Sequence, residues 1–320
     1  MGTLDWSELT RSQKKQELYA RETWFREGLR DAEEILGPQR LPVVLRETAL
    51  LMLKPDGLAA ARLEPVLKFV TEHDFEVAAV RDFRFEGHHW RELWRYQLTS
   101  ATLDRLAVND LILGSGPALV LLLRSGPGHE LPATVRMSTL KGSATLEAQR
   151  PGTLRSLLGQ PNRVLSQLHV ADEPADLLRE LGLLFGESAR RDLYAALASG
   201  DLAPRDKATL DRALRDHPAP GRSLALADAL RAVTEAVDAS EAGTGGPGPA
   251  SAGVRDALAR MERGERVAWR PFAAGLKALG ARPDRWDLAV LGTYVIEYDE
   301  PGHPKVLTNP DPQSWKRATA

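Results

Sequence analysis

The 320-residue chain contains no cysteine, which excludes disulfide bonds, thiolate metal sites and cysteine nucleophiles and suits a reducing compartment. It has almost no excess charge, with 42 lysines and arginines against 44 aspartates and glutamates, so nucleic acid and anionic lipid are not expected partners. Apolar runs such as ALVLLL are far too short to span a membrane, and the amino-terminal residues lack an apolar core of signal-peptide length. These absences predict a cytoplasmic protein that does not enter a membrane.

What is present indicates an ordinary globular protein. Hydrophobic residues make up 43% and charged residues 27% of the chain, and the length allows two domains or one domain with extensions. We expect an N-terminal helical arm over residues 1–46, a domain over 47–188 and a mainly helical C-terminal region over 189–320. A stretch rich in glycine and proline at 241–253 predicts a linker.

The arm has the spacing of an amphipathic helix that LGPQRLP breaks. Acidic and basic residues mix on its polar side, so we expect it to pack on the next domain rather than lie on a membrane.

From Thr48 on, strand-like and helix-like segments alternate. TALLML, FEVAAVRDFRF, ALVLLLRS and a short segment near RVLSQL predict strands, and KPDG predicts a tight loop after the first of them. LEPVLKFVTEH, HHWRELWRY, ATLDRLAVNDLIL, PATVRMSTLKG and a segment beginning near Asp172 predict helices. This order contains the β-α-β-β-α-β pattern of a ferredoxin-like antiparallel sheet with helices on one face, an α+β fold. In the C-terminal region, VRDALARMERG and FAAGLKALG predict helices and LAVLGTYVIEY predicts a strand.

Four separated segments carry a resemblance to a known family. They are LMLKPDG at 51–57, SGPALVLLL at 115–123, RPGTLR at 150–155 and the stretch from His169 to Phe185. In this order and rough spacing they resemble the nucleoside diphosphate kinases, over residues from about 47 to 186. The resemblance implies that family's fold for this part of the chain and does not extend to the arm or the C-terminal region.

The resemblance also implies roles for individual residues. His169 matches the histidine that becomes phosphorylated, and Glu180, eleven residues later, matches the glutamate that binds its imidazole. Lys54 matches the lysine that contacts the transferred phosphate, and Arg155 matches an arginine that clamps the phosphates. Asp172 matches the acidic residue shortly after the histidine.

Three further candidates for nucleotide binding stand at or beside positions where the family has other residues. Trp90 falls where the family has a tyrosine near the histidine, and Ser166 falls where it has an asparagine. The family's threonine is Ala144 here, with Thr145 next to it.

Phosphoryl transfer requires positioning and neutralisation of the phosphate charge, which suits lysine, arginine and Mg²⁺. A neutral imidazole nitrogen can attack phosphorus, and a carboxylate on the other nitrogen fixes the tautomer. The resemblance therefore implies a ping-pong reaction in which ATP phosphorylates His169 and an acceptor then takes the phosphate. It implies Mg²⁺ held mainly by the nucleotide phosphates, with no metal site built from protein residues.

Several departures from the family pattern concern the parts that hold the nucleotide. Ser138 replaces a phosphate-clamping arginine, and neither Arg136 nor Lys141 is in register to substitute for it. The serine expected two residues after the histidine is Ala171. The aromatic segment that stacks the base is absent; Trp94 or Tyr96 forms a replacement wall, or else packs in the core.

These observations leave three interpretations. The first is a divergent phosphotransferase whose acceptor is a nucleoside diphosphate or a specialised small molecule, with a homo-oligomer possible and the C-terminal region reshaping the acceptor side or blocking oligomer contacts. The second is a catalytically relaxed nucleotide-binding pseudoenzyme or scaffold module. The third is use of the same histidine as a protein kinase or in a phosphorelay. The retained pair of His169 and Glu180 favours the enzyme, because a pseudoenzyme has no reason to keep both at this spacing.

Overall fold

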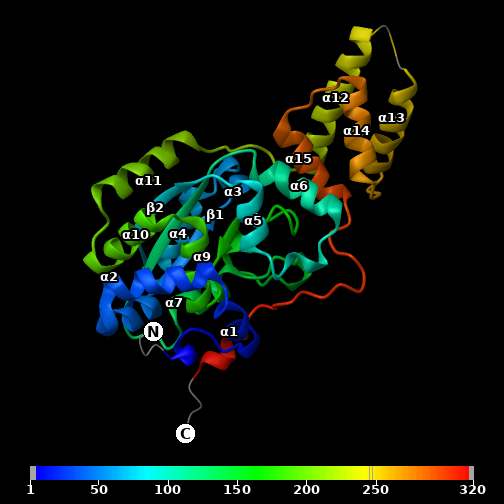
Figure 1. The fold of residues 1–320 in the computed structure, drawn as a ribbon. Coiled ribbons are helices and arrows are strands. Elements are labelled where there is room, and N and C mark those ends of the chain that lie inside the picture. The colour runs from blue at the N-terminus through cyan, green and yellow to red at the C-terminus, as the bar shows by residue number, and fades with distance from the viewer. Residues whose placement is uncertain (1–4, 245, 247, 317–320) are drawn as a thin grey trace.

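A computed structural model describes residues 5–244, 246 and 248–316 of the chain. At its centre is a four-stranded antiparallel sheet with the strand order β2-β3-β1-β4 (Figure 1). The strands are β1 (Thr48–Leu53), β2 (Phe75–Phe83), β3 (Ala118–Ser125) and β4 (Leu168–Val170). This arrangement confirms the predicted antiparallel α+β fold, with the last strand a little later in the chain than RVLSQL.

Helices cover both faces of the sheet. On one face lie α4 (Leu63–Glu72), α7 (Ala133–Lys141), α8 (Leu154–Leu157) and α11 (Pro204–Asp216), and on the other lie α2 (Thr23–Glu47), α9 (Pro174–Leu184) and α10 (Glu187–Ser199). The prediction of helices on one face only is therefore wrong. The reason is that the arm and the helices after β4 cover the second face, so that every residue of β1 is buried.

The arm begins with η1 (Trp6–Glu8) and α1 (Gln13–Tyr19) and continues into α2. At Gly37, inside LGPQRLP, φ is +69°, a value that suits glycine, and the helix bends there before it continues to Glu47. The predicted break is thus a kink. The arm packs on the domain through α2 against α9 and α10, as expected.

The C-terminal region is helical. Its helices α12 (Leu226–Thr244), α13 (Pro249–Glu262), α14 (Trp269–Leu279) and α15 (Arg285–Val295) form a bundle beside α6 (Leu103–Leu113) and share a hydrophobic core with it (Figure 1). The predicted strand at LAVLGTYVIEY is wrong: it lies largely in α15, which packs against α6 and α12, and a short apolar run does not distinguish the two structures. The predicted linker at 241–253 is also largely helical, although residues 245 and 247 lie outside the described residues.

After α15 the chain runs back across the central domain. Residues 297–307 lie along residues 96–102, where the backbone N–H of Thr102 donates to Tyr298 and that of Glu300 donates to Ser100. The chain then reaches η4 (Pro312–Trp315), which lies near the arm (Figure 1). No described helix is long and apolar enough to cross a membrane.

Candidate active site

His169 lies in the middle of β4, paired with Met52 of β1. Its neighbours Leu168 and Val170 are buried in the core on the side of α4 and α7, so alternation along the strand turns His169 to the opposite face. There α9 presents Glu180, whose two carboxylate oxygens each lie 2.9 Å from Nε2 of the imidazole. The glutamate side chain is 6% exposed and that of the histidine 15%, so the pair is shielded from water.

Trp94 lies on the other side of the imidazole. Its indole nitrogen is 3.3 Å from Nδ1, and the two rings meet edge to face with centroids 5.7 Å apart. An indole N–H only donates, so Nδ1 of His169 must accept and Nε2 must carry the hydrogen. The hydrogen-bond pattern therefore assigns the tautomer in which Nε2–H donates to Glu180 and Nδ1 keeps its lone pair.

The KPDG segment fixes the backbone immediately before the histidine. It forms α3 (Pro55–Ala59), a short helix in which Asp56 accepts the backbone N–H of Gln167 at 2.8 Å, while the backbone N–H of Lys54 donates to the Gln167 carbonyl at 2.9 Å. Gln167 has a φ of +62°, uncommon for a residue with a side chain. A Cβ on Gly57 would lie 2.3 Å from the Gln167 carbonyl oxygen, so only glycine allows this close approach.

A cavity of about 140 Å³ opens beside His169. Its walls come from β4 and the loop before it, from α6, and from the segments around Lys54, Trp94 and Arg155. Four of the lining side chains are cationic: Lys54, Arg105, Arg155 and Arg163. None of the lining residues is acidic. A cavity lined in this way favours an anionic ligand.

Two of these cations are almost completely buried. Nζ of Lys54 donates to the Val164 carbonyl at 3.1 Å and lies 3.4 Å from Asp56. Burial lowers the pKa of Lys54; Asp56 opposes this, and Arg155 adds to the lowering. Arg155 donates to the carbonyl oxygens of Gly142 and Leu168, and its Nε is buried without a partner among the described residues.

Burial also lowers the pKa of Arg155, to about 10, although Asp172 and Asp56 partly oppose it. Buried cations whose protonated forms are disfavoured gain most from a bound anion.

The structure brings together some of the residues expected at the site. Lys54, Arg155, Ser166 and His169 line the same cavity, with Glu180 directly behind the imidazole. Trp90 and Thr145 are not among the lining residues.

Trp90 lies in α5 (Gly87–Leu93), is buried and donates from its indole to Asp110, so the side chain near the histidine is Trp94 instead. Thr145 is exposed and precedes η3 (Leu146–Ala148). Tyr96 faces the arm, where it stacks on Tyr19.

The part of the chain that contains His169 matches a known family. The family model described as Nucleoside diphosphate kinase matches residues 47–189. These residues form a nucleoside diphosphate kinase-like domain. The resemblance found in the sequence over residues 47–186 is thereby confirmed, and the arm and the C-terminal region lie outside the matched range.

The curated relatives that the chain matches are much longer proteins. One named Thioredoxin domain-containing protein 3 homolog, from Heliocidaris crassispina, is 26% identical over 152 residues, which is 46% of this chain and 17% of the relative. Another of the same name, from Ciona intestinalis, is 24% identical over 181 residues, which is 54% of this chain and 27% of the relative. The chain thus spans about a quarter or less of the length of these relatives.

Similar solved structures include three nucleoside diphosphate kinases. The enzyme from Aquifex aeolicus is 22% identical with a TM-score of 0.36 over 44% of this chain and 95% of that chain. The enzyme from Pyrobaculum aerophilum is 17% identical with a TM-score of 0.35, covering 44% and 97%. The enzyme from Halobacterium salinarum, solved in complex with CDP, is 16% identical with a TM-score of 0.33, covering 40% and 78%.

Ser138, which stands where the family has a phosphate-clamping arginine, belongs to a hydrogen-bonded cluster around Asp172. The Ser138 hydroxyl donates to the Asp172 carboxylate at 2.6 Å, and Lys141 donates to the same oxygen at 2.9 Å. Arg136 lies elsewhere, where it stacks on Phe75 and binds backbone carbonyls. Neither Arg136 nor Lys141 therefore supplies a cation to the cavity.

The cavity instead has two further cationic side chains, Arg105 and Arg163, which the sequence did not identify as site residues. Arg105 shares one face of α6 with Asn109 and Ile112, a spacing that places all three toward one surface and was visible in the sequence. Arg163 lies six residues before His169, in a loop that Asn162 ties to Thr293 of the C-terminal region at 2.9 Å. No pattern near Arg163 in the sequence indicates this contact between Asn162 and the C-terminal region.

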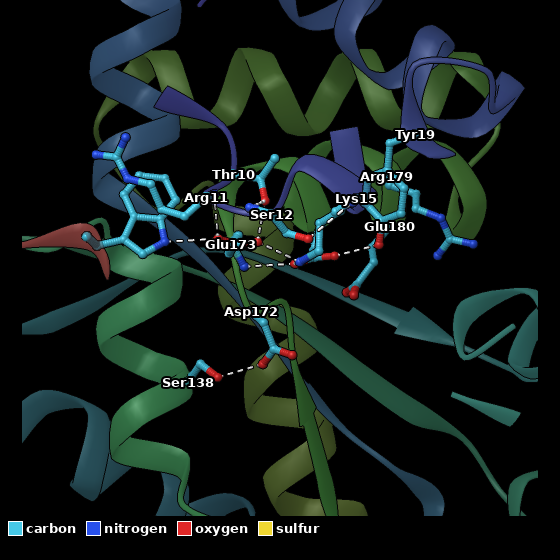
Figure 2. Close-up of polar contacts among 12 residues, drawn as sticks. Thr10, Arg11, Ser12, Lys15, Tyr19, Ser138, Asp172, Glu173, Arg179 and Glu180 are labelled. Carbon is cyan, nitrogen blue, oxygen red and sulfur yellow. Dashed lines mark hydrogen bonds and ion pairs between the residues drawn. The ribbon is translucent and has the colours of Figure 1, made fainter. Parts of the chain in front are cut away.

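The arm and η4 meet at the start of α9, the helix of the kinase-like domain that carries Glu180 (Figure 2). The buried carboxylate of Glu173 accepts hydrogen bonds from four groups: the Thr10 hydroxyl, the Arg11 backbone, Lys15 and the Trp315 indole. Lys15 also binds Asp176, as does the hydroxyl of Tyr19. The arm and the C-terminal end of the described chain therefore hold the helix that orients His169.

The oxygen atoms that line the cavity decide whether the protein itself could bind Mg²⁺ there. The lining side chains offer amide and hydroxyl oxygens, from Gln97, Asn109 and Ser166, but no carboxylate. Such oxygens could contribute to an ion whose other ligands are phosphate oxygens. Elsewhere in the described part of the chain, Glu86, His88 and His89 have ligand atoms within 4.8 Å of one another at the start of α5.

Proposed function

We propose that the kinase-like domain transfers a phosphoryl group from ATP to an acceptor through a covalent intermediate on Nδ1 of His169. One observation carries this proposal: Glu180 binds the Nε2–H of the imidazole, which leaves the Nδ1 lone pair at a cavity lined by Lys54 and Arg155. An oriented nucleophile beside buried cations is what phosphoryl transfer needs from a protein.

In the first half-reaction, the Nδ1 lone pair forms a bond to the γ-phosphorus as the bond to the β,γ-bridging oxygen breaks. ADP leaves with that electron pair, and the imidazole becomes positively charged while Nε2–H remains bonded to Glu180. The carboxylate stabilises this charge, as the acid does behind other catalytic histidines. In the second half-reaction an acceptor oxygen forms a bond to the phosphorus as the Nδ1–phosphorus bond breaks. The electron pair of that bond returns to Nδ1, which restores neutral His169.

The buried cations supply the electrostatic part of the reaction. Lys54 and Arg155 are held by backbone carbonyls and by Asp56, so little reorganisation is needed when negative charge develops on the phosphoryl oxygens. Mg²⁺ bound to the substrate phosphates would neutralise further charge. Trp94 must release Nδ1 before the attack, since its indole N–H donates to the attacking lone pair.

The acceptor in this proposal is a nucleoside diphosphate or a specialised small molecule. The cavity of about 140 Å³ is smaller than the roughly 300–1,000 Å³ that a drug-sized ligand occupies. A complete nucleotide therefore requires side chains around the cavity to move. The absence of cysteine supports a cytoplasmic location for the reaction.

A second candidate function is nucleotide binding without turnover, as in a scaffold module. The observation that favours it is the hydrogen bond from Trp94, which occupies the Nδ1 lone pair that the reaction needs. The two candidates differ in one measurable respect, because only the phosphotransferase acquires a covalent phosphoryl group.

The test is to incubate the protein with γ-labelled ATP and Mg²⁺ and to measure acid-labile label on the chain. We expect label on the wild type and none on His169→Ala. His88→Ala removes an exposed histidine outside the cavity and should label as the wild type does. Absence of label on the wild type would contradict the proposal and favour the binding module. A chase with nucleoside diphosphates then examines the acceptor.

A further inference from the structure

Arg105 and Arg163 share one carboxylate. Nη1 of Arg105 lies 2.7 Å from Oδ1 of Asp299, and Nη1 of Arg163 lies 2.7 Å from Oδ2. The two arginines come from α6 and from the loop before β4, and both line the cavity beside His169. Asp299 comes from the segment after α15, outside the kinase-like domain. One anionic group thus bridges two guanidinium groups, with one oxygen on each.

The surroundings of this bridge remain short of negative charge. Lys305 lies close enough that Arg163 and Arg105 lower its pKa, after burial, which is the larger cause. Lys54 and Arg155 line the same cavity. Asp56, Asp172 and Asp299 are carboxylates that offset these five cations in the described structure. Nε of Arg105 is buried without a hydrogen-bond partner among the described residues.

Asp299 lies on a partly exposed segment at the surface of the protein. Its side chain is 34% exposed, and besides the two arginines it accepts a hydrogen bond from the Ser100 hydroxyl at 3.1 Å. Its backbone makes an isolated bridge to Ala101, and the segment around it contacts residues 96–102 rather than entering the sheet. A carboxylate on such a segment can leave without unfolding the core, because short surface segments open at low cost.

We propose that Arg105 and Arg163 form a second anion subsite of the cavity, where Asp299 occupies the place of an anionic group of the phosphate acceptor. The acceptor is then a small molecule that already carries a phosphate, and this group binds the two arginines while the reacting oxygen faces His169. Guanidinium pairs suit this ligand class because they match phosphate geometry and bind it by charge-assisted hydrogen bonds.

This inference deepens the proposed function and rests on it only in identifying the ligand as the acceptor. The subsite is therefore tested by binding rather than by turnover. Inorganic pyrophosphate is the probe, and its dissociation constant is measured by calorimetry for the full chain. The measurement is repeated in His169→Ala, so that a failure of the phosphohistidine chemistry leaves the binding result intact.

Asp299→Asn removes the competing charge, and we expect it to bind pyrophosphate about tenfold more tightly, or better. Arg163→Gln removes one of the two guanidinium groups and should bind about tenfold more weakly. Glu297→Gln is the matched control, since Glu297 lies in the same segment but pairs with Arg266 outside the cavity. It should leave the dissociation constant unchanged.

Unchanged or weaker pyrophosphate binding by Asp299→Asn would overturn the proposal, because Asp299 would then serve only to orient the arginines. If that variant does not fold, Arg163→Gln decides: an unchanged dissociation constant contradicts the subsite, and a tenfold increase supports it. Binding that depends on Asp299 and Arg163 but not on His169 supports the subsite even where no label reaches the histidine.

Discussion

Replacing Lys15 with methionine tests whether the arm is an integral part of the kinase-like domain. Nζ of Lys15 lies 2.7 Å from Glu173 (Figure 2) and 2.6 Å from Asp176, and all three side chains are at most 10% exposed. Burial disfavours the charged lysine, but Asp176 and Glu173 outweigh it and raise its pKa well above the ordinary value. The charge of Lys15 thus compensates the cost of burying the carboxylates of Glu173 and Asp176.

Methionine is close to lysine in length and apolar, so Lys15→Met removes the charge while keeping most of the volume. Breaking a buried ion pair by removing one partner costs about 3–5 kcal/mol, because the other partner stays buried and uncompensated. We expect a loss of this size in the free energy of unfolding at pH 7, measured by urea denaturation with circular dichroism. Lys14→Met alters an exposed neighbour and should change it by no more than about 0.5 kcal/mol.

A second readout follows from the carboxylates. Without Lys15, burial raises the pKa of both carboxyls, so they take up protons as the pH falls below neutral and the difference between Lys15→Met and the wild type should shrink. A loss below about 1 kcal/mol at pH 7, or a difference that does not depend on pH, would show that Lys15 does not stabilise the two carboxylates in the way described. In that case the network in Figure 2 would be a contact of little energetic weight.

Three further predictions concern the site. Gly57→Ala should lower the free energy of unfolding by about 1–3 kcal/mol and slow labelling, because the new Cβ meets the Gln167 carbonyl two residues before His169. Glu180→Gln should fold but slow single-turnover labelling by about 10²-fold or more, since an amide N–H on Nε2 favours the tautomer whose Nδ1 is protonated. Asp172→Asn should flatten the loss of stability at acid pH, measured by urea midpoints between about pH 5 and pH 2.

The sign of the last effect follows from the charges around Asp172. Burial raises the pKa of this carboxyl, but Lys141 and Lys15 outweigh it and hold the pKa well below the ordinary value. Its stabilisation is therefore present above the unfolded pKa and is lost as the pH falls through the folded one.

The following control and results would test the predictions for these three variants. Gly126→Ala is the control for Gly57→Ala, because a Cβ at Gly126 meets nothing within 4 Å. Labelling of Glu180→Gln within about threefold of the wild type would contradict the role of the carboxylate. An acid limb in Asp172→Asn as steep as that of the wild type would show that other carboxyls dominate acid unfolding.

The sequence predicted those parts of the fold whose information is local. Alternation in FEVAAVRDFRF and the apolar run ALVLLLRS placed β2 and β3, and the helical segment expected near Asp172 is α9. LAVLGTYVIEY was misassigned because a helix buried on several sides has the same composition as a buried strand. The division into regions 1–46, 47–188 and 189–320 stays a prediction.

The residues of the candidate site also differ in whether local sequence patterns indicate them. Residues near a motif, such as Lys54, Arg155 and His169, were found because their spacing along the chain carries the information. Asp299 was not found, because it reaches the cavity only through the return of the chain after α15. Trp94 was considered, but its bond to the imidazole depends on tertiary packing that no pattern within HHWRELWRY reveals.

The central claim is that Nδ1 of His169 is the nucleophile, and the nitrogen that carries the phosphate tests it most directly. The protein is labelled with γ-labelled ATP and Mg²⁺ and hydrolysed in alkali, and the two phosphohistidine isomers are separated against standards. We expect label on Nδ1, because Nε2 donates to Glu180 in the assigned tautomer. Label on Nε2, on another residue or on none would contradict it.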